Sequence, residues 1–357
     1  MAGGTLNLTG SSINNPVTIG ALATLVDANG GLASSAAIAN AGILTVNAAD
    51  TIATYLSNGG SLTGTGLFTT TFATLNTGSS VSGYLSAGTL TSNGAVAISG
   101  SATAASFSIA SGVLTNTGIL AATSQLNITG GATLIAGGTQ TYNLLTTSGA
   151  GAGTWQGNLN NPTVVAPGGV GATGTLAVTG QFSNAPGGTL KLDLGAGCHD
   201  LVTVGGTATF GGTLDLNQLS PIAPFVPVQV VAAGSYSGNF TTLTENLDGA
   251  AWFNPGNGAV MTLALPTAGG STLYGTTANQ TAVWVSLYDD VIDPAATNVT
   301  YTPGGGYTIT SRIANAGNPD LLNALPPDYS PASGFGVDRL LYSLSSRNHS
   351  PCQWWAA

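Results

Sequence analysis

Charged residues are scarce in this chain of 357 residues. Asp, Glu, Lys and Arg make up 5% of it, whereas about a quarter of a typical globular domain is charged. Only four residues are basic, Lys191, Arg312, Arg339 and Arg347, and the formal net charge is −9. Because proteins bind nucleic acid through surfaces rich in lysine and arginine, this composition excludes nucleic acid as a partner.

Long apolar runs and cysteines are also rare. No stretch reaches the roughly 18 apolar residues of a membrane-spanning helix, so we expect no membrane span in this chain. The first residues contain neither a basic region nor an apolar core, and no signal peptide is visible. Cys198 and Cys352 are the only cysteines. Their separation fits no metal-ligand spacing and leaves one long-range disulfide open.

Short segments of alternating apolar and polar residues, separated by Gly and Asn, fill most of the chain. Alternation with a period of two predicts β-strands that bury one face. Gly and Asn predict tight turns between them, because both residues reach left-handed backbone conformations at low cost. Examples of these segments are Thr5–Thr9, Ile43–Asn47, Ala95–Ser99, Gln125–Thr129 and Thr175–Thr179.

The turns recur at a regular spacing. Asn-x-Gly begins at Asn40, Asn58 and Asn76, in steps of 18 residues, and again at Asn116, two further steps of about 20. A fixed period of this length is typical of a solenoid. We therefore predict an all-β fold, a parallel β-solenoid of about 18–20-residue coils over residues 1–265. A β-sandwich, which also has short strands and Gly-rich turns, is the alternative.

Stacked coils also explain the low charge. Equivalent positions of successive coils lie about 4.8 Å apart, so a repeated Lys or Glu would face its own charge. Ser, Thr and Asn at these positions can instead form hydrogen-bonded ladders. We expect such ladders along the outside of the solenoid.

The character of the sequence changes at Pro266. Val299–Thr302 and Tyr307–Thr310 flank a Pro-Gly-Gly-Gly turn and predict a β-hairpin. Val337, Leu340, Leu341 and Leu344 follow helical spacing and predict one short amphipathic helix. Because an open solenoid end exposes unpaired strand edges, we interpret residues 266–357 as a small C-terminal capping or assembly module.

Residues 166–243 carry a resemblance to a known family. The motifs are Thr173–Gly180, Gly187–Gly195 and His199–Leu216, in which Gly-Gly-Thr-Leu and Gly-Gly-Thr-Ala introduce alternating strands. They resemble the C-terminal part of bacterial autotransporter passenger domains and related secreted repeat proteins. The resemblance implies a right-handed parallel β-helix that is exported and displayed at the bacterial cell surface, where many such proteins are adhesins. The chain departs from that family after residue 266, since about 90 residues are too few for its membrane barrel.

We predict no catalytic residue. Asp193 and Asp215 are 22 positions apart, about one coil, and could stack on one face as an acid and base pair. Turn or strand-end aspartates are the simpler interpretation. Cys198 and His199 are adjacent on a predicted strand and point to opposite faces, which argues against a thiol–imidazole pair.

Ligand and assembly candidates lie in the C-terminal segment. Asp289, Asp290 and Asp293 form a dense acidic cluster, a weak candidate for calcium, which prefers closely spaced oxygen ligands. We expect no other cofactor. Aromatic side chains near a chain end stack on sugars or dock on a neighbouring subunit. The assembly or ligand candidates are therefore Trp284, Trp354 and Trp355.

Together these features predict an extracellular, non-enzymatic structural β-solenoid, a subunit of a cell-surface fibre or adhesin. Its partners would be other copies of itself, joined head-to-tail into a filament, or surface glycans. The alternatives are a carbohydrate-active β-helix enzyme and a glycan-binding module.

Overall fold

The computed structural model describes residues 3–10, 12–32, 37–195, 197–220, 222, 227–247, 249–264, 299–302 and 306–309. These residues fall into two units. The first contains the described residues up to Leu219, together with Gln229–Thr244 and Pro255–Gly258; the second contains those of Ser220–Val228, Glu245–Asn254 and the chain from Ala259. Every regular element assigned within these ranges is a β-strand. Among them no helix is long and apolar enough to cross a membrane.

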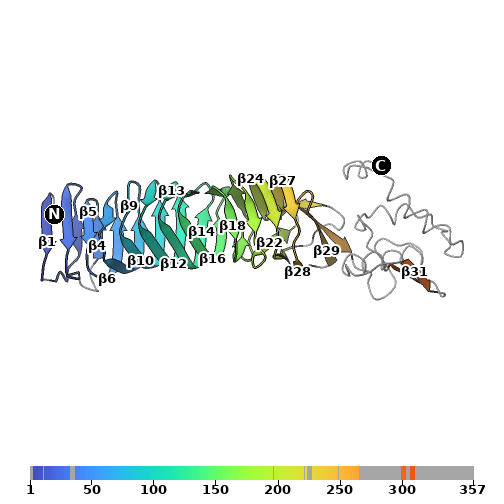
Figure 1. Ribbon diagram of the computed structural model, residues 1–357, viewed down its shortest axis with the longest axis horizontal. Helices are drawn as coiled ribbons and strands as arrows, with labels where there is room; N and C mark the ends of the chain where they lie inside the picture. The colour runs from blue at the N-terminus through green and yellow to red at the C-terminus, as the bar shows by residue number, and fades with distance from the viewer. Residues whose placement is uncertain are drawn as a thin grey trace. The chain divides into compact units, whose positions relative to one another are not determined.

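Two long sheets run through the first unit, and the chain alternates between them (Figure 1). The first sheet contains β1 (Gly4–Leu8), β3 (Ala23–Asp27), β5 (Ile43–Val46), β7 (Ser61–Thr63), β9 (Ser80–Val81), β11 (Val96–Ile98), β13 (Val113–Asn116), β15 (Thr133–Ala136), β17 (Ala152–Gln156), β18 (Leu159–Asn161), β20 (Thr175–Val178), β21 (Phe182–Asn184), β24 (Leu201–Phe210) and β27 (Val231–Gly238).

The second sheet takes the strands between them. It contains β2 (Val17–Ile19), β4 (Ala37–Asn40), β6 (Asp50–Ser57), β8 (Leu67–Leu75), β10 (Tyr84–Asn93), β12 (Ser101–Ser111), β14 (Ile119–Thr129), β16 (Thr139–Ser148), β19 (Val164–Ala166), β22 (Thr189–Gly195), β23 (Cys198–His199), β25 (Thr213–Gln218) and β28 (Thr242–Asn246).

Except for β23, which pairs antiparallel with β22, the paired strands of these two sheets are parallel, and most pairs join successive coils. Strands β8, β10, β12 and β14, for example, pair in this order and all run the same way. An antiparallel sandwich would pair consecutive strands through hairpins. The fold is therefore the predicted parallel β-solenoid, and the β-sandwich alternative is wrong.

The coils lengthen along the chain. In the first sheet Leu25 pairs with Leu44, 19 positions later, and in the second Leu67 pairs with Tyr84, 17 positions later. Towards the end of the unit, Val202 pairs with Val231, 29 positions later. The predicted coil of 18–20 residues is thus close for the early coils and too short for the late ones, because the later coils carry longer connections.

The core is built from columns of apolar side chains, one from each coil. Along the second sheet the register connects a continuous buried column, in which the small Ala73 lies between the larger Tyr55 and Leu90. Its members are Ile38, Tyr55, Ala73, Leu90, Phe107, Leu126, Leu145, Val165, Leu190 and Leu214. Within each strand, the residues on either side of the column member point outward, and this explains the alternation of apolar and polar residues.

The long strands of the second sheet change face midway. In β10, Leu85 and Ala87 are buried, then Gly88 and Thr89 both lie outside the core, and burial resumes at Leu90. Two consecutive outward residues shift the alternation by one, so the strand bends around the core. The two halves of such a strand therefore form two faces of the coil, and the strand of the first sheet forms the third.

Asparagines line the turns in two different ways. Asn58, Asn76 and Asn93 form an outer ladder, with Nδ2–Oδ1 distances of 2.7 and 3.1 Å between successive coils. Asn40 and Asn116 are instead buried and donate to the carbonyls of Ser61 and Thr139 in the following coil. Asn40 ends a strand of the second sheet and Asn116 one of the first. Their similar flanking sequences therefore mark two different corners of the coil.

The described strands of the second unit pair differently. β29 (Gly249–Asn254) and β30 (Ala259–Ala264) are antiparallel and share a sheet with β26 (Val228–Gln229). Residues 249–264, which we expected to continue the coils to residue 265, form this sheet instead. The predicted hairpin is confirmed, as β31 (Val299–Thr302) pairs antiparallel with β32 (Gly306–Ile309). The predicted helix at 337–344 lies outside the described residues.

Candidate functional site

Most of the binding residues proposed from the sequence lie outside the described part of the chain. They are the tryptophans of the C-terminal segment and the acidic cluster considered for calcium, namely Trp284, Trp354, Trp355, Asp289, Asp290 and Asp293. Cys352, and with it the question of a disulfide, lies there too. Within the described ranges no three His, Cys, Asp or Glu side chains gather as a metal site would require.

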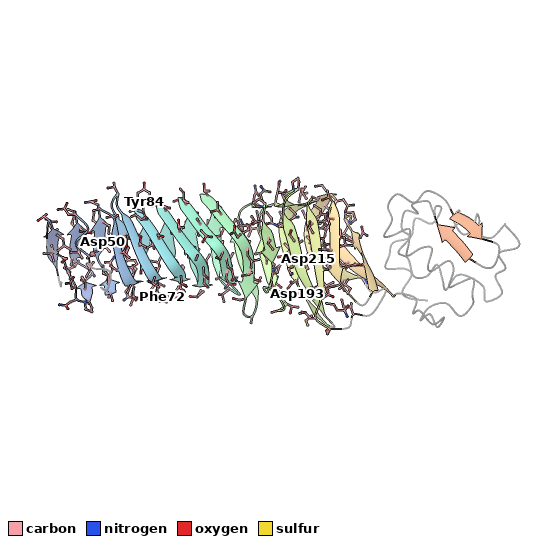
Figure 2. The ribbon with its side chains drawn as sticks, turned by 90° about the horizontal axis from the view of Figure 1, so that it is seen from below. Asp50, Phe72, Tyr84, Asp193 and Asp215 are labelled. Carbon is pink, nitrogen blue, oxygen red and sulfur yellow. The ribbon has the colours of Figure 1, made fainter. Side chains whose placement is uncertain are left out.

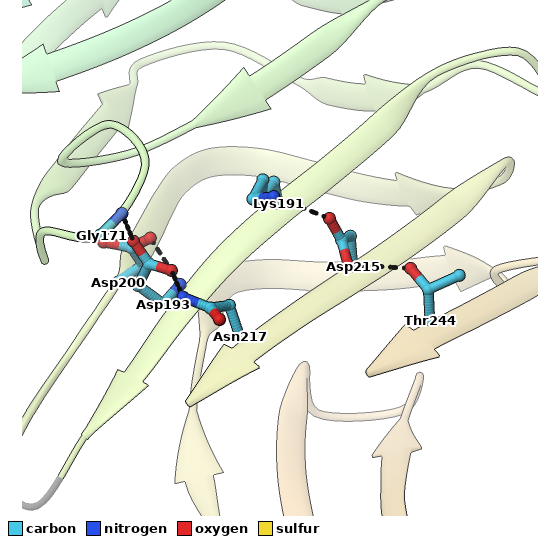
Figure 3. Close-up of polar contacts among 7 residues, drawn as sticks. All are labelled: Gly171, Lys191, Asp193, Asp200, Asp215, Asn217 and Thr244. Carbon is cyan, nitrogen blue, oxygen red and sulfur yellow. Dashed lines mark hydrogen bonds and ion pairs between the residues drawn. The ribbon is translucent and has the colours of Figure 1, made fainter. Parts of the chain in front are cut away.

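Asp193 and Asp215, the pair weighed for acid and base catalysis, lie on neighbouring strands but do not stack on each other. The register places Asp193 opposite Asn217 and Lys191 opposite Asp215 (Figure 3). The coil at this point is 24 residues long, two more than the separation of the two aspartates. Each carboxylate therefore has its own partners, in two distinct environments.

Asp215 belongs to a partly exposed ion pair. Its Oδ2 lies 3.2 Å from Lys191 Nζ, and its Oδ1 accepts a hydrogen bond of 2.9 Å from the Thr244 hydroxyl. Both charged side chains are 29% exposed. Pairs in such contact with water contribute about 0–1 kcal/mol to stability. The Asp215 carboxylate is thus engaged on the outer face of the late coils.

Asp193 is buried under a loop that leaves the coil after β19. Its Oδ2 accepts the backbone N–H groups of Gly171 and Ala172 at 2.6 and 3.0 Å, and its Oδ1 accepts Asn217 Nδ2 at 2.6 Å. Asp200 is buried beside it and accepts the backbone N–H groups of Gly174 and Asp193 at 2.7 and 2.8 Å. The two carboxyls therefore act as a clamp that holds the loop on the solenoid.

Burial dominates the electrostatics of this clamp. Burial is the main cause that raises the pKa of Asp200, to about 8. The backbone N–H groups of Asp193 and Gly174 lower this pKa, and the charge of Asp193 raises it, with smaller effects. All four oxygens of the two carboxyls receive a hydrogen bond from a nitrogen. The arrangement is that of a satisfied structural network.

Cys198 and His199 lie on the short strand β23, which pairs antiparallel with the end of β22. Cys198 is exposed, whereas His199 is partly buried and Asp200 is fully buried. No hydrogen bond between the thiol and the imidazole occurs among the contacts of these residues. Cys198 and His199 are thus consecutive residues of one strand.

A second buried carboxyl pair lies in the early coils, where the sequence had suggested nothing. Asp27 ends β3 and Asp50 begins β6, and both side chains are turned into the core. Asp27 Oδ1 accepts the Gly31 N–H at 2.7 Å, and Asp50 Oδ2 accepts the Leu32 N–H at 2.6 Å. Like the first pair, these two carboxyls hold a loop, here Ala28–Leu32.

Burial of these two aspartates leaves the early coils without surface charge. Asp27 and Asp50 are the only charged side chains before Lys191, and they are 0% and 7% exposed. The outer surface combines hydroxyl ladders, such as Ser61–Ser80 at 2.8 Å, with exposed apolar side chains such as Leu22 and Leu67. Phe72 and Tyr84 project from it, at opposite edges of the view in Figure 2.

The fold and these contacts define the class of this protein as a parallel β-solenoid, consistent with a β-helix repeat protein. Comparisons with protein-family models, with curated proteins and with solved structures give no match for the chain. The identity of the chain beyond its class therefore rests on its own residues.

Sequence reasoning missed both carboxyl clamps for the same reason. Asp27 and Asp50 are 23 positions apart and Asp193 and Asp200 only 7, so neither pair matches the coil spacing that was used to find neighbours. One feature of the sequence indicates the first pair: Asp27 occupies an inward position of the alternating segment Ala23–Asp27. A carboxylate at an inward position requires hydrogen-bond partners. The loop that follows Asp27 is the nearest source of backbone donors.

Proposed function

We propose that this chain is an extracellular structural β-solenoid that serves as a subunit of a cell-surface fibre or as an adhesin. The observation that carries the proposal is the combination of continuous parallel ladders with an outer surface that has no side-chain charge from residue 3 to residue 190. A surface without charges has no ion pairs to be screened, so its ladders are insensitive to salt. Such a rod suits a mechanical role outside the cell.

The extracellular and bacterial parts of this proposal draw support from the sequence. Residues 166–243 resemble autotransporter passenger domains, which are displayed on the cell surface. The scarcity of cysteine and of charge agrees with a secreted repeat protein but carries less weight. In the filament form of the proposal, copies join head-to-tail through a heterologous contact, which repeats without closing.

Immunogold labelling of intact source cells tests the location and the role together. Antibodies raised against the purified chain are applied to intact and to permeabilised cells. The proposal expects gold on the surface of intact cells, along fibres or evenly distributed, and loss of this label after treatment with an external protease. Label that appears only after permeabilisation would refute it.

Binding of neutral glycans is a second candidate function, and Phe72 is the observation that favours it. The ring is 57% exposed and lies in register between Thr54 and Thr89 on the uncharged face. Exposed aromatic rings stack on sugar faces while neighbouring hydroxyls form hydrogen bonds. Co-sedimentation with insoluble neutral polysaccharides tests it. Retention should fall in Phe72→Ala and persist in Leu67→Ala, a control that removes another exposed apolar side chain of β8.

A further inference from the structure

The Asp27–Asp50 pair differs from the Asp193–Asp200 clamp in one respect, the number of hydrogen-bond donors. Asp27 Oδ1 accepts Gly31 N–H, Asp50 Oδ2 accepts Leu32 N–H at 2.6 Å, and Asp50 Oδ1 accepts the N–H of its neighbour Thr51 at 2.9 Å. The fourth oxygen, Asp27 Oδ2, is buried and receives no hydrogen bond from any nitrogen or hydroxyl of the described residues. A buried carboxylate oxygen without a donor is costly.

Among the described residues no cationic side chain pairs with Asp27 or Asp50. The first 190 residues contain no Lys, Arg or His, and the chain's amino terminus lies outside the described residues. The register places Leu8 and Val46 on either side of Asp27, and Phe68 beside Asp50. Tyr55, the nearest other titratable group on β6, directs its hydroxyl to Asn40. A proton held between the two carboxyls would satisfy Asp27 Oδ2 without any further group.

We propose that Asp27 and Asp50 share one proton and thereby form a pH-dependent latch that holds the loop Ala28–Leu32 on the early coils. With the proton present, the Asp50 carboxyl donates to Asp27 Oδ2, and both acids keep their backbone N–H contacts to the loop. When the proton leaves to solvent, two negative charges face each other in the core. Their repulsion and their need for water favour opening of the loop.

The expected pH range follows from the Asp50 carboxyl. Burial, followed by the contact with Asp27, raises the pKa of Asp50 to about 6, whereas an aspartate in an open loop titrates near 4. The closed form therefore binds the proton more tightly than the open form. Opening becomes more favourable as pH rises from about 4 to about 6, and levels off above that range.

Hydrogen exchange of the full chain tests the latch. Protection of the Gly31 and Leu32 amides, corrected for intrinsic exchange, is measured at pH 4.5 and pH 7.5. We expect a fall of about tenfold or more between them, since each unit of pKa difference changes the equilibrium tenfold. Equal protection at the two pH values would overturn the proposal.

Two variants make the test specific. In Asp50→Asn one side chain of the pair is uncharged at every pH, so the protection of the loop should no longer fall between the two pH values. In the control Asp200→Asn, which changes the other clamp, the tenfold fall at Gly31 and Leu32 should remain. A fall that persists in Asp50→Asn would contradict the latch. Should Asp50→Asn not fold, Asp27→Asn removes the charge from the other side chain and is read in the same way.

Discussion

Truncation of Phe107 in the central column is the sharpest test of how the coils hold together. The Phe107 side chain is fully buried and lies in register between Leu90 and Leu126 of the adjacent coils. Removing a buried phenylalanine side chain typically costs about 3–5 kcal/mol, because apolar contacts are lost and a cavity remains. Ser106→Ala is the matched control, since its neighbouring position faces outward, and we expect a change within about 0.5 kcal/mol.

The effect of Phe107→Ala should also be local. In a solenoid each coil contacts only its neighbours, so destabilisation concentrates in the coils that flank the cavity. Urea unfolding measures the total loss, and hydrogen exchange locates it. Amides of β10, β12 and β14 should exchange about a hundredfold faster or more, while those of β24 change little. Equal unfolding midpoints for Phe107→Ala and Ser106→Ala would refute the column as the source of stability.

Three further predictions concern pH, turns and the surface ion pair. Because burial raises the pKa of Asp50 to about 6 and of Asp200 to about 8, the folded chain binds more protons than the unfolded one; its free energy of unfolding should fall as pH rises from about 4 to 8 in urea titrations. Gly118→Ala would place Cβ 2.1 Å from the Gly100 carbonyl oxygen and should lower the melting temperature more than Gly187→Ala, whose Cβ comes no closer than 3.9 Å to a neighbour. Asp215→Asn should change the unfolding free energy by less than about 1 kcal/mol, since its ion pair is partly exposed.

The alternating segments were the reliable part of the sequence. Segments such as Ile43–Asn47 and Thr175–Thr179 contain the strands β5 and β20, because inward residues at every second position leave little freedom about which face is buried. The regular spacing of the turns predicted that equivalent strands of successive coils pair in parallel. Alternation by itself predicts only each strand and its buried face.

The length of each coil could not be read from the turns alone. Asn40 and Asn116 share the pattern Asn-x-Gly-Ile-Leu but lie at different corners, so the pattern reports a local need for a tight turn and not a position along the coil. The loop held by Asp193 adds residues between strands without disturbing the ladder. Insertions of this kind cost little, because a loop outside the ladder displaces no core contact.

The candidate site was the least predictable part. Asp193 and Asp215 were compared by their spacing, and a coil two residues longer than that spacing was enough to give each a different partner. The carboxyl pair Asp27–Asp50 depends on contacts between the end of one strand and the start of another. Such contacts arise from how the chain turns the corner, which residue types alone do not specify.

Electron microscopy of the purified chain over a wide range of concentrations tests the central claim most directly. A structural subunit that joins head-to-tail predicts narrow filaments of uniform width whose length grows with concentration, and that persist at high salt because the early coils carry no surface charge. Isolated particles at every concentration, together with an absence of matching fibres on the source cells, would contradict the filament and leave a displayed monomer.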